Sequence, residues 1–260
     1  MPSPRILILV VILALGCQPA VPVDLRLVTY NIRHGRGMDG EVNLERTAAV
    51  LRELAPDIVA LQEVDNGVIR SGSQDQAAVL GELLGMHHAF GSFMDYQGGQ
   101  YGMAILSRLP IVRVNPVALP DGNEPRVALA VEVEASGGHR LMLVNVHFDW
   151  VASDSFRFAQ AEHLAGYLDA LTVPYLLLGD FNDEPASRTL GLFRSRAVEV
   201  AKPAGAGVTF PSAEPVKEID YIFAAPAAAW DVGTAAVIAE REASDHRPVR
   251  GVVTLKPPQR

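Results

Sequence analysis

Residues suited to metal or phosphate chemistry recur in this sequence directly after short apolar runs. Asn31 follows Leu-Val-Thr-Tyr, Glu63 follows Ile-Val-Ala-Leu-Gln, and His147 follows Leu-Val-Asn-Val. Asp180 and Asn182 come just after a fourth run, Leu-Leu-Leu-Gly. Asp and Asn are also common turn residues, so one such placement alone is weak. Its repetition predicts a shared site, because folds of this kind place functional residues in loops at strand ends.

Three further residues extend the pattern near the C-terminus. Asp220 opens Asp-Tyr-Ile-Phe, and Asp245 and His246 stand just before Pro-Val. Carboxylates with an Asn amide form an oxygen-rich set, which suits Mg²⁺, Mn²⁺ or Ca²⁺ better than Zn²⁺. The histidines could hold phosphate oxygens, or one could act as a general acid or base. Together these residue types predict metal-assisted hydrolysis of a phosphoester.

Hydrophobic periodicity predicts the elements that must position these residues. Helices are expected over residues 44–54, 74–84 and 155–171. Strands are expected over residues 25–30, 58–61, 103–106, 111–117, 127–134, 141–146, 175–178, 219–223, 231–238 and 249–255. This mixture of helices with more numerous strands favours packed sheets with helices outside. No linker or repeat interrupts the chain after Asp24, so we expect one domain over residues 24–256.

Composition limits the classes of function. The 260 residues are 49% hydrophobic and 20% charged, with a formal net charge of −8, which is typical of a globular protein. The acidic balance argues against tight, non-specific nucleic-acid binding. It remains compatible with an enzyme that holds a phosphate through a metal ion. Cys17 is the only cysteine, so an intramolecular disulfide is excluded.

The N-terminus has the pattern of an export signal. Arg5 precedes an apolar run over residues 6–15, which is too short for a membrane-spanning helix but fits a signal peptide. Ala14-Leu15-Gly16-Cys17 resembles a bacterial lipoprotein signal, although a typical signal has Leu where Ala14 stands. We expect a signal peptide over residues 1–16, a lipid on Cys17, a tether over residues 17–23 and a location in the cell envelope. An ordinary secretion signal, giving a secreted or periplasmic protein, is the alternative.

Seven ordered motifs resemble those of the endonuclease/exonuclease/phosphatase superfamily. This superfamily includes pancreatic-type deoxyribonucleases, abasic-site endonucleases, neutral sphingomyelinases and inositol polyphosphate phosphatases. The motifs are Thr29-Tyr30-Asn31-Ile32-Arg33, Leu61-Gln62-Glu63-Val64-Asp65, Tyr101-Gly102-Met103-Ala104-Ile105-Leu106-Ser107-Arg108, Asn145-Val146-His147-Phe148, Gly179-Asp180-Phe181-Asn182, Ile219-Asp220-Tyr221 and Ser244-Asp245-His246-Arg247-Pro248-Val249. One motif alone would be weak, but the ordered set covers nearly all of residues 25–255.

The resemblance implies a fold and a metal site. The expected fold is a four-layer α/β/β/α sandwich, in which two mixed sheets lie face to face with helices outside. Glu63 is implied as the principal metal ligand, with Asn31 and Asp245 nearby. Asp180 and Asn182 are implied to position the attacking water, or a second metal, and the phosphate. One metal or two, and Mg²⁺ or another divalent ion, stay open.

The resemblance also implies contacts to the scissile phosphate. His147 and His246 are expected to touch it, and Asp220 is expected to orient His246. Tyr101 and Arg126 fall where members of the superfamily place further phosphate contacts. Members differ on whether the carboxylate corresponding to Asp180 or a His–Asp pair is the general base, so both assignments stay open.

The nature of the substrate leaves three alternatives. A lipid, inositol-type or other small phosphoester is favoured by the charge and the export signal, with the membrane reached through the lipid anchor and the chain a monomer. Extracellular DNA or RNA is the second. The third is an inactive surface protein used only for binding, although none of the expected site residues is missing.

Two features near the expected site have both functional and structural interpretations. Arg33, His34 and Arg36 form either a solvated loop or a rim for a second anionic group. Trp150 follows His147 closely and could stack on a base or sugar or lie at a membrane surface. Covering a sheet edge is the commoner role of such a Trp, and this is what we expect. Arg70 lies in the loop after Glu63, where it could shape the pocket.

Overall fold

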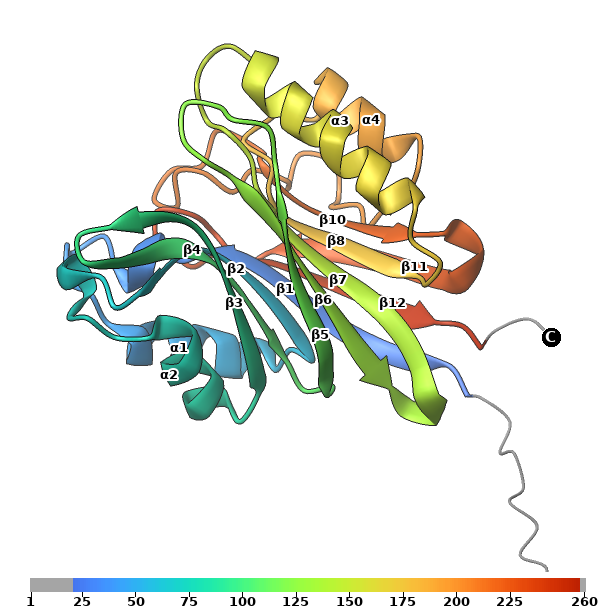
Figure 1. The fold of residues 1–260 in the computed structure, drawn as a ribbon, viewed down its shortest axis with the longest axis horizontal. Coiled ribbons are helices and arrows are strands. Elements are labelled where there is room, and N and C mark those ends of the chain that lie inside the picture. Colours follow the sequence, from blue (N-terminus) through green and yellow to red (C-terminus); the bar gives the residue numbers. More distant parts are fainter. Residues whose placement is uncertain (1–20, 258–260) are drawn as a thin grey trace, which may run out of the picture.

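Strands rich in apolar residues form the framework of the molecule. The computed structural model describes residues 21–257, which form two six-stranded sheets packed face to face (Figure 1). The strand order is β11-β12-β1-β2-β4-β3 in the first sheet and β5-β6-β7-β8-β10-β9 in the second. The strands are β1 (Val23–Asn31), β2 (Ile58–Asn66), β3 (His87–Tyr96), β4 (Gly99–Ser107), β5 (Ile111–Ala118), β6 (Val127–Ala135), β7 (His139–His147), β8 (Tyr175–Asp180), β9 (Val198–Glu199), β10 (Asp220–Ala225), β11 (Trp230–Val237) and β12 (Val249–Leu255).

Each sheet is mixed, with one parallel pair at its centre. β1 runs parallel to β2, and β7 runs parallel to β8, whereas all other paired strands are antiparallel. Asn31 is paired with Gln62 at the end of the first pair, and His147 with Asp180 at the end of the second. The carboxyl ends of β1, β7 and β8 therefore each deliver a polar residue to the same end of the molecule, next to Gln62 within β2.

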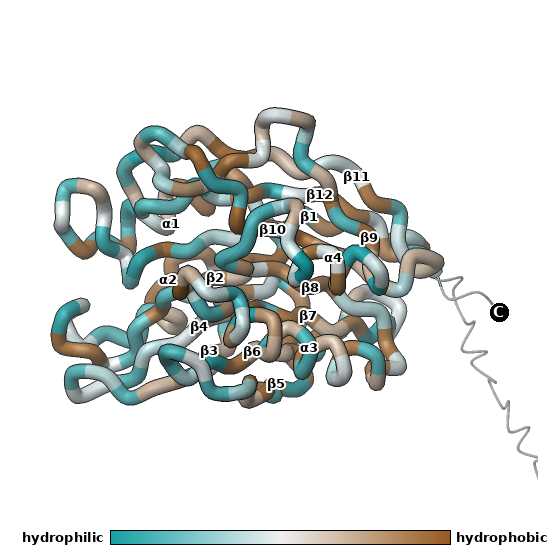
Figure 2. Tube along the Cα trace, turned by 90° about the horizontal axis from the view of Figure 1, so that it is seen from above, coloured by the Kyte–Doolittle hydropathy of each residue, from teal (hydrophilic) through white to brown (hydrophobic). Residues whose placement is uncertain are grey.

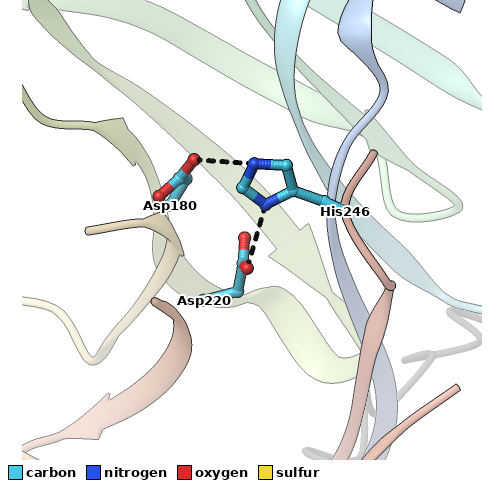
Figure 3. A group of neighbouring side chains, drawn as sticks. All are labelled: Asp180, Asp220 and His246. Carbon is cyan, nitrogen blue, oxygen red and sulfur yellow. Dashed lines mark hydrogen bonds and ion pairs between the residues drawn. The ribbon is translucent and has the colours of Figure 1, made fainter. Parts of the chain in front are cut away.

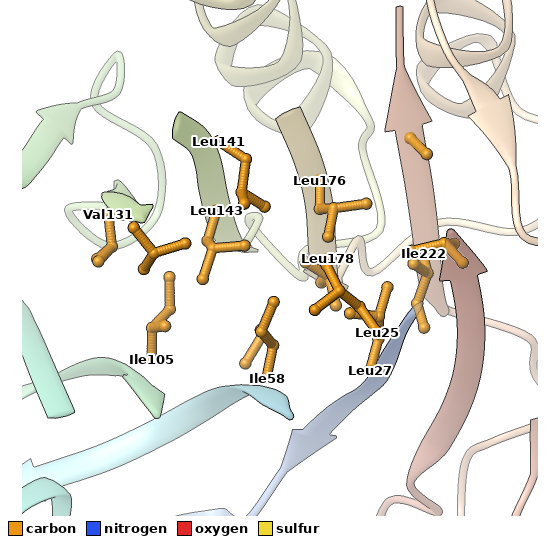
Figure 4. Packing of buried hydrophobic residues seen from close by; sticks show 14 of the residues in the cluster. Leu25, Leu27, Ile58, Ile105, Val131, Leu141, Leu143, Leu176, Leu178 and Ile222 are labelled. Atoms are coloured by element: carbon orange, nitrogen blue, oxygen red, sulfur yellow. The ribbon is translucent and has the colours of Figure 1, made fainter. Parts of the chain in front are cut away.

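The principal core lies between the two sheets. Leu27 and Ile58 of the first sheet face Leu143 and Leu178 of the second, and all four side chains are completely buried (Figure 4). Full burial of a side chain of this size stabilises the fold by roughly 1.5–3 kcal/mol. In Figure 2 the hydrophobic residues follow the central strands, and the loops around them are mainly hydrophilic.

Four α-helices form the outer layers. α1 (Leu44–Leu54) and α2 (Gln76–Leu84) share a buried cluster with the first sheet, and α3 (Ser155–Asp169) and α4 (Arg188–Arg194) share one with the second. Asn43 and Asp75 cap α1 and α2 by accepting backbone N–H groups of the first turn. Within residues 21–257, no helix is both long and apolar enough to cross a membrane.

The four-layer α/β/β/α sandwich predicted from the sequence is confirmed, and each predicted helix and strand has a counterpart. β2 extends past the expected residue 61 to Asn66, and α2 begins at Gln76 instead of residue 74. Two strands and one α-helix were not predicted, namely β3, β9 and α4. The expected signal peptide, the lipid on Cys17 and most of the tether lie outside the described residues, so they stay predictions.

Candidate active site

A bulge in β2 directs the side chain of Glu63 into a cavity. The register between β2 and β4 shifts between Leu61 and Val64, and Glu63 has φ +55°, in the left-handed region. This conformation costs about 1–2 kcal/mol for a residue with a Cβ. The cavity has a volume of about 590 Å³ and is lined by Glu63 from the first sheet and by His147 and Asp180 from the second.

A buried pair of amides beneath the cavity joins the sheets. Asn145 of β7 donates from Nδ2 to the carbonyls of Leu61 (2.8 Å) and Ala104 (2.9 Å). Gln62 in turn donates from Nε2 to Asn145 Oδ1 at 2.7 Å. Both side chains are completely buried. Asn145 therefore satisfies a carbonyl beside the bulge, and the pair fixes the position of Glu63 relative to the second sheet.

Asn31 connects carboxylates of the two sheets from behind the cavity wall. Its Nδ2 donates to Glu63 Oε1 (3.0 Å) and Asp180 Oδ2 (3.2 Å), while its Oδ1 accepts the Arg33 N–H. The amide oxygen, which the sequence predicts near a metal, is thus turned away from Glu63. In this arrangement Asn31 orients the two carboxylates.

His246 lies between two aspartates (Figure 3). Its Nδ1 is 3.1 Å from Asp220 Oδ2, and its Nε2 is 3.7 Å from Asp180 Oδ2. Burial alone would lower the pKa of His246, but Asp220 and Asp180 outweigh it and raise this pKa to about 10. Burial, followed by the charge of Asp220, raises the pKa of Asp180 to about 7. His246 is therefore a cation at neutral pH.

His147 has the opposite protonation state. Its Nε2 is 3.6 Å from Asp180 Oδ2, and its side chain is almost completely buried. Burial lowers the pKa of His147 well below its usual value, and the charges of Arg126 and His246 lower it further. Asp180 thus stands between a protonated and a neutral imidazole. Such a pairing of acid and base is suited to proton transfer at a phosphate.

Asp245 lies on the loop after β11, next to the end of β1. Ser244 Oγ donates to the Asn31 carbonyl at 2.7 Å, and Asp245 Oδ2 is 3.4 Å from Arg33 Nε. Arg33 therefore faces a carboxylate of the site rather than forming a separate anion-binding rim. His34 is buried, with its carbonyl accepting from Gln76, so the solvated-loop alternative does not hold for this residue.

The donor set fits a hard divalent ion. Glu63, Asp180 and Asp245 present carboxylates to one cavity, and oxygen donors of this kind suit Mg²⁺, Mn²⁺ or Ca²⁺. Asp180, Asp220 and His246 form a group whose possible ligand atoms all lie within 4.8 Å of one another. Both nitrogens of His246 face carboxylates as a protonated imidazole, which is not a metal ligand. The carboxylates are therefore the better candidates for ligands.

Arg126 and Tyr101 supply donors at the cavity wall. Arg126 pairs with Glu124 at 2.9 Å, but its Nε and one terminal nitrogen are buried without a hydrogen-bond partner. Burial raises the pKa of Tyr101, so its hydroxyl stays protonated. Arg70, held by the buried Asp65 at 2.8 Å, lies over the Tyr101 ring and fixes it. The unpartnered guanidinium nitrogens have the chemistry of an anion contact.

Asn182 is held by the backbone of the neighbouring loop. Its Nδ2 donates to the Phe148 carbonyl at 3.0 Å, and its N–H donates to Asp180 Oδ1 at 2.9 Å. Asn182 lines the cavity, whereas Asp220 stands behind the wall and reaches the site through His246. The structure thus brings together all the site residues expected within residues 21–257, and their individual roles stay predictions.

Some residues of the site were not foreseen. Gln62 and Asn145 lie inside apolar strands, and Arg157 lies in α3 and lines the cavity. The first two stand within the sequence motifs given above, but no role was assigned to them, because each is an uncharged amide within a run of apolar residues. Trp150 does not cover a sheet edge, because it is 58% exposed and lines the cavity.

The sequence and the fold are similar to those of known proteins. The chain is 27% identical over 250 residues to uncharacterized protein YbhP of Escherichia coli K12, covering 89% of this chain and 97% of that protein. It is similar to an endonuclease/exonuclease/phosphatase of Beutenbergia cavernae, with 26% identity, TM-score 0.72, and 90% of this chain and 72% of that one covered. A mannosyl-6-phosphatase, Bt3783 of Bacteroides thetaiotaomicron, shares the fold at 19% identity and TM-score 0.72, with 88% and 99% covered.

The sequence model of the Endonuclease/Exonuclease/phosphatase family matches residues 28–246. This range begins in β1, ends at His246 and includes every element that contributes to the cavity. Members of the family are generally phosphoester hydrolases, a chemistry that the acidic cavity and its two histidines also suit. The chain therefore belongs to the endonuclease/exonuclease/phosphatase family.

Proposed function

We propose that this protein is a divalent-metal-dependent hydrolase of small phosphoesters. The observation that carries the proposal is the position of Asp180 between two imidazoles, with its Oδ2 3.7 Å from His246 Nε2 and 3.6 Å from His147 Nε2. Glu63 and Asp245 would hold the ion, and Asn31 would orient Glu63. When bound, the ion supplies positive charge against the charge that develops on the phosphate.

The other steps of hydrolysis are assigned to side chains of the cavity and its wall. Protonated His246 donates from Nε2 to a phosphate oxygen, and Asp220 keeps the proton on Nδ1. Asp180, with a pKa of about 7, accepts a proton from the attacking water as the water oxygen bonds to phosphorus. The bond from phosphorus to the ester oxygen breaks, and the leaving oxygen keeps the electron pair and takes a proton from solvent. Arg126 donates through its unpartnered nitrogens to a non-bridging oxygen. We favour Asp180 as the base because His246 already holds its proton.

A small substrate is supported by the charges around the cavity. The lining carries six carboxylates, on Glu63, Glu124, Asp180, Asp183, Glu184 and Asp245. Arg126 and Arg157 are paired with Glu124 and Asp183, so they provide little positive field beyond the site. A nucleic acid requires several neutralised phosphates, which these residues do not offer. An inactive binding role has less support, because the whole acid–base arrangement is intact.

A hydrolysis panel tests the proposal. Residues 18–260 would be assayed with 4-nitrophenyl phosphate, bis(4-nitrophenyl) phosphate, glucose 6-phosphate, inositol phosphates, sphingomyelin vesicles and DNA, with Mg²⁺ or with a chelator. We expect Mg²⁺-dependent cleavage of a small ester, lowered at least 100-fold by Glu63→Gln and by His246→Gln. Glu53→Gln, at an exposed position on α1, is the matched control. Full activity in chelator, or in both site variants, would refute the proposal.

We propose also that the protein is exported and anchored through Cys17. The support is the sequence pattern described above. In the structure, β1 leads from Val23 to the site at Asn31, so the site lies about 26 Å from the end where residue 23 enters the fold. Metabolic labelling with palmitate should mark the wild-type chain and not Cys17→Ser, and the variant should leave the membrane fraction. Equal labelling of both would contradict the anchor.

A further inference from the structure

Trp150 is an aromatic side chain that the fold holds in solvent at the mouth of the cavity. Its exposed fraction is 58%, and it lines the same cavity as His147 and Asp180. The other tryptophan, Trp230, is 3% exposed and donates its indole N–H to the Ala225 carbonyl at 3.0 Å. Trp150 is thus the only exposed aromatic residue of the cavity lining within the described chain.

The backbone on both sides of Trp150 is fixed by hydrogen bonds to buried side chains. Arg157 donates from one terminal nitrogen to the carbonyls of Asp149 (2.9 Å) and Val151 (3.1 Å). The completely buried Asp149 accepts the Val151 N–H at 3.1 Å, and its own N–H donates to Gln160. The indole is therefore exposed on an ordered loop, so little conformational freedom would be lost when a ligand stacks on it.

The same buried side chains tie Trp150 to the loops that contact the phosphate. Asp149 Oδ2 accepts the Asn123 N–H at 2.6 Å, three residues before Arg126. Arg157 Nε is 3.1 Å from Asp183 Oδ2, in the loop that begins at Asp180. A Cβ at Gly122 would meet Asp149 Oδ2 at 2.4 Å, so only glycine allows this close approach. Trp150 consequently has a fixed position relative to both Arg126 and Asp180.

Charges of the cavity lining restrict what would lie against Trp150. Lys217 is the one cation of the lining without an ion-pair partner among residues 21–257, and Glu184 is a carboxylate without one. A second phosphate would meet carboxylates that outnumber free cations. An uncharged ring could instead lie with its flat face on the indole, and its hydroxyl or amino groups would meet a cavity lining that includes Glu184 and Lys217. This combination selects a neutral ring over a polyanionic chain.

We propose that Trp150 is the platform of a leaving-group subsite that binds the uncharged ring of a small phosphate ester, a sugar or a nucleoside. Trp150 is a specificity-determining residue, and Arg157 is the positioning residue that fixes it. The proposal rests on the proposed function, since it names the substrate class of the same site. It adds the part of the substrate that distinguishes this site from one for a polyanion.

Tryptophan fluorescence tests the subsite without catalysis. Binding would be measured in the His246→Gln protein with Mg²⁺, using glucose 6-phosphate, adenosine 5′-monophosphate, ethyl phosphate, inorganic phosphate and an oligothymidylate. In the same protein with Trp150→Ala, the tryptophan fluorescence comes from the buried Trp230 alone. We expect a ring-bearing phosphate to change the Trp150 emission and protect it from acrylamide, and ethyl phosphate and inorganic phosphate to leave the emission unchanged. Tighter binding of glucose 6-phosphate would identify the ring as a sugar, and tighter binding of adenosine 5′-monophosphate would identify it as a nucleoside.

Kinetics gives the second readout. In the otherwise wild-type protein, Trp150→Ala should raise KM for the preferred ring ester about tenfold or more, with kcat nearly unchanged and hydrolysis of ethyl phosphate unaffected. Phe156→Ala is the matched control, because Phe156 is 41% exposed on α3 and does not line the cavity. This control should leave KM unchanged.

Three results would overturn the subsite. They are an equal response of Trp150 to inorganic phosphate and to ring-bearing probes, an unchanged ring preference in Trp150→Ala, and tighter binding of the oligothymidylate than of the single nucleotide. Failure of the proposed function is a different result. It would appear as ring-specific binding to Trp150 with no Mg²⁺-dependent hydrolysis, whereas hydrolysis without any Trp150 effect would refute the subsite alone.

Discussion

Glu63 holds its carboxylate in the cavity in a backbone conformation that glycine adopts more easily. Its φ of +55° is unfavourable for any residue with a Cβ, and the bulge in β2 imposes it. A left-handed residue that serves a site is a common place for backbone strain. The residue therefore illustrates a local conflict between stability and chemistry.

This conflict predicts an inverted order of stability at position 63. Glycine normally destabilises a strand relative to alanine, but here we expect Glu63→Gly to be more stable than Glu63→Ala by about 1 kcal/mol. Neither variant should hydrolyse phosphoesters. Urea unfolding of both proteins measures the difference. Greater stability of the alanine variant would show that position 63 carries no backbone strain.

His34 predicts a dependence of stability on pH that is separate from activity. The residue is buried, and burial, followed by the charge of Arg70, lowers its pKa to about 4. In the unfolded chain it takes up a proton near pH 6.5. Its contribution is therefore fully present above pH 6.5 and is lost as the pH falls towards 4, because the unfolded state then binds the extra proton.

We expect the free energy of unfolding to fall more steeply between pH 6.5 and 4 in the wild type than in His34→Gln. The difference should be about 1–2 kcal/mol, after allowing for solvent screening at the partly accessible imidazole. Urea unfolding at several pH values measures it, with His87→Gln at an exposed position on β3 as control. Parallel slopes for the wild type and His34→Gln would contradict the burial argument.

Helices and strands differ in how clearly the sequence predicts them. Strands with long apolar runs, such as β7 and β8, could be predicted because burial on both faces demands such residues. β3 was missed because its buried face carries Ala89, Gly91 and Phe93, a weak hydrophobic signal. The end of β2 was missed because the bulge adds a residue and breaks the alternation of buried and exposed positions.

The residues of the site also differ in how well they could be predicted from the sequence. Polar residues directly after apolar runs, such as Glu63 and His147, could be recognised because the end of the run is visible in the sequence. Asn145 belongs to one of the motifs, but its position within a strand gives no sign of a contact to the other sheet. Arg157 could not be recognised, since it lies on a helix far from the motifs. Their importance arises from pairing between sheets and loops, which only the assembled fold brings together.

The pairing of β7 with β8 requires glycine at position 179. Gly179 has φ +151°, and a Cβ there would lie 2.1 Å from the Val146 carbonyl oxygen. We expect Gly179→Ala to destabilise the fold by about 3 kcal/mol or more, because the backbone next to Asp180 and His147 must shift. Thermal unfolding of the purified variant, or its loss as insoluble protein, measures this effect.

Gly166 provides the matched substitution. It lies within α3, and a Cβ there meets nothing within 4 Å. Gly166→Ala should therefore stabilise the protein by about 0.5–1 kcal/mol, since alanine is the better helix former. Equal effects of the two glycine substitutions would show that the close approach at Val146 does not constrain the strand pair.

At the scale of the whole molecule, both sheets contribute negatively charged carboxylates to the cavity and its wall. Glu63 comes from the first sheet, Asp180 and Asp220 come from the second, and Asp245 comes from the loop that leads back into the first. The overall net charge of −8 adds to this repulsion. Asn31 and His246 offset part of it by donating to these carboxylates. A divalent ion held across the two sheets would offset more.

This geometry predicts that a divalent ion stabilises the whole fold. Mg²⁺ at about 100 times its Kd should raise the free energy of unfolding by about 2.7 kcal/mol, which corresponds to a rise in Tm of roughly 5–10 °C for a domain of this size. Differential scanning calorimetry with Mg²⁺ or chelator measures the shift. Glu63→Gln should largely abolish the shift while leaving the Tm in chelator equal or higher, because it removes a ligand and one of the repelling charges together. An equal Mg²⁺-induced shift in Glu63→Gln would mean that the ion binds elsewhere, and the carboxylates of the cavity would then need a partner other than a metal.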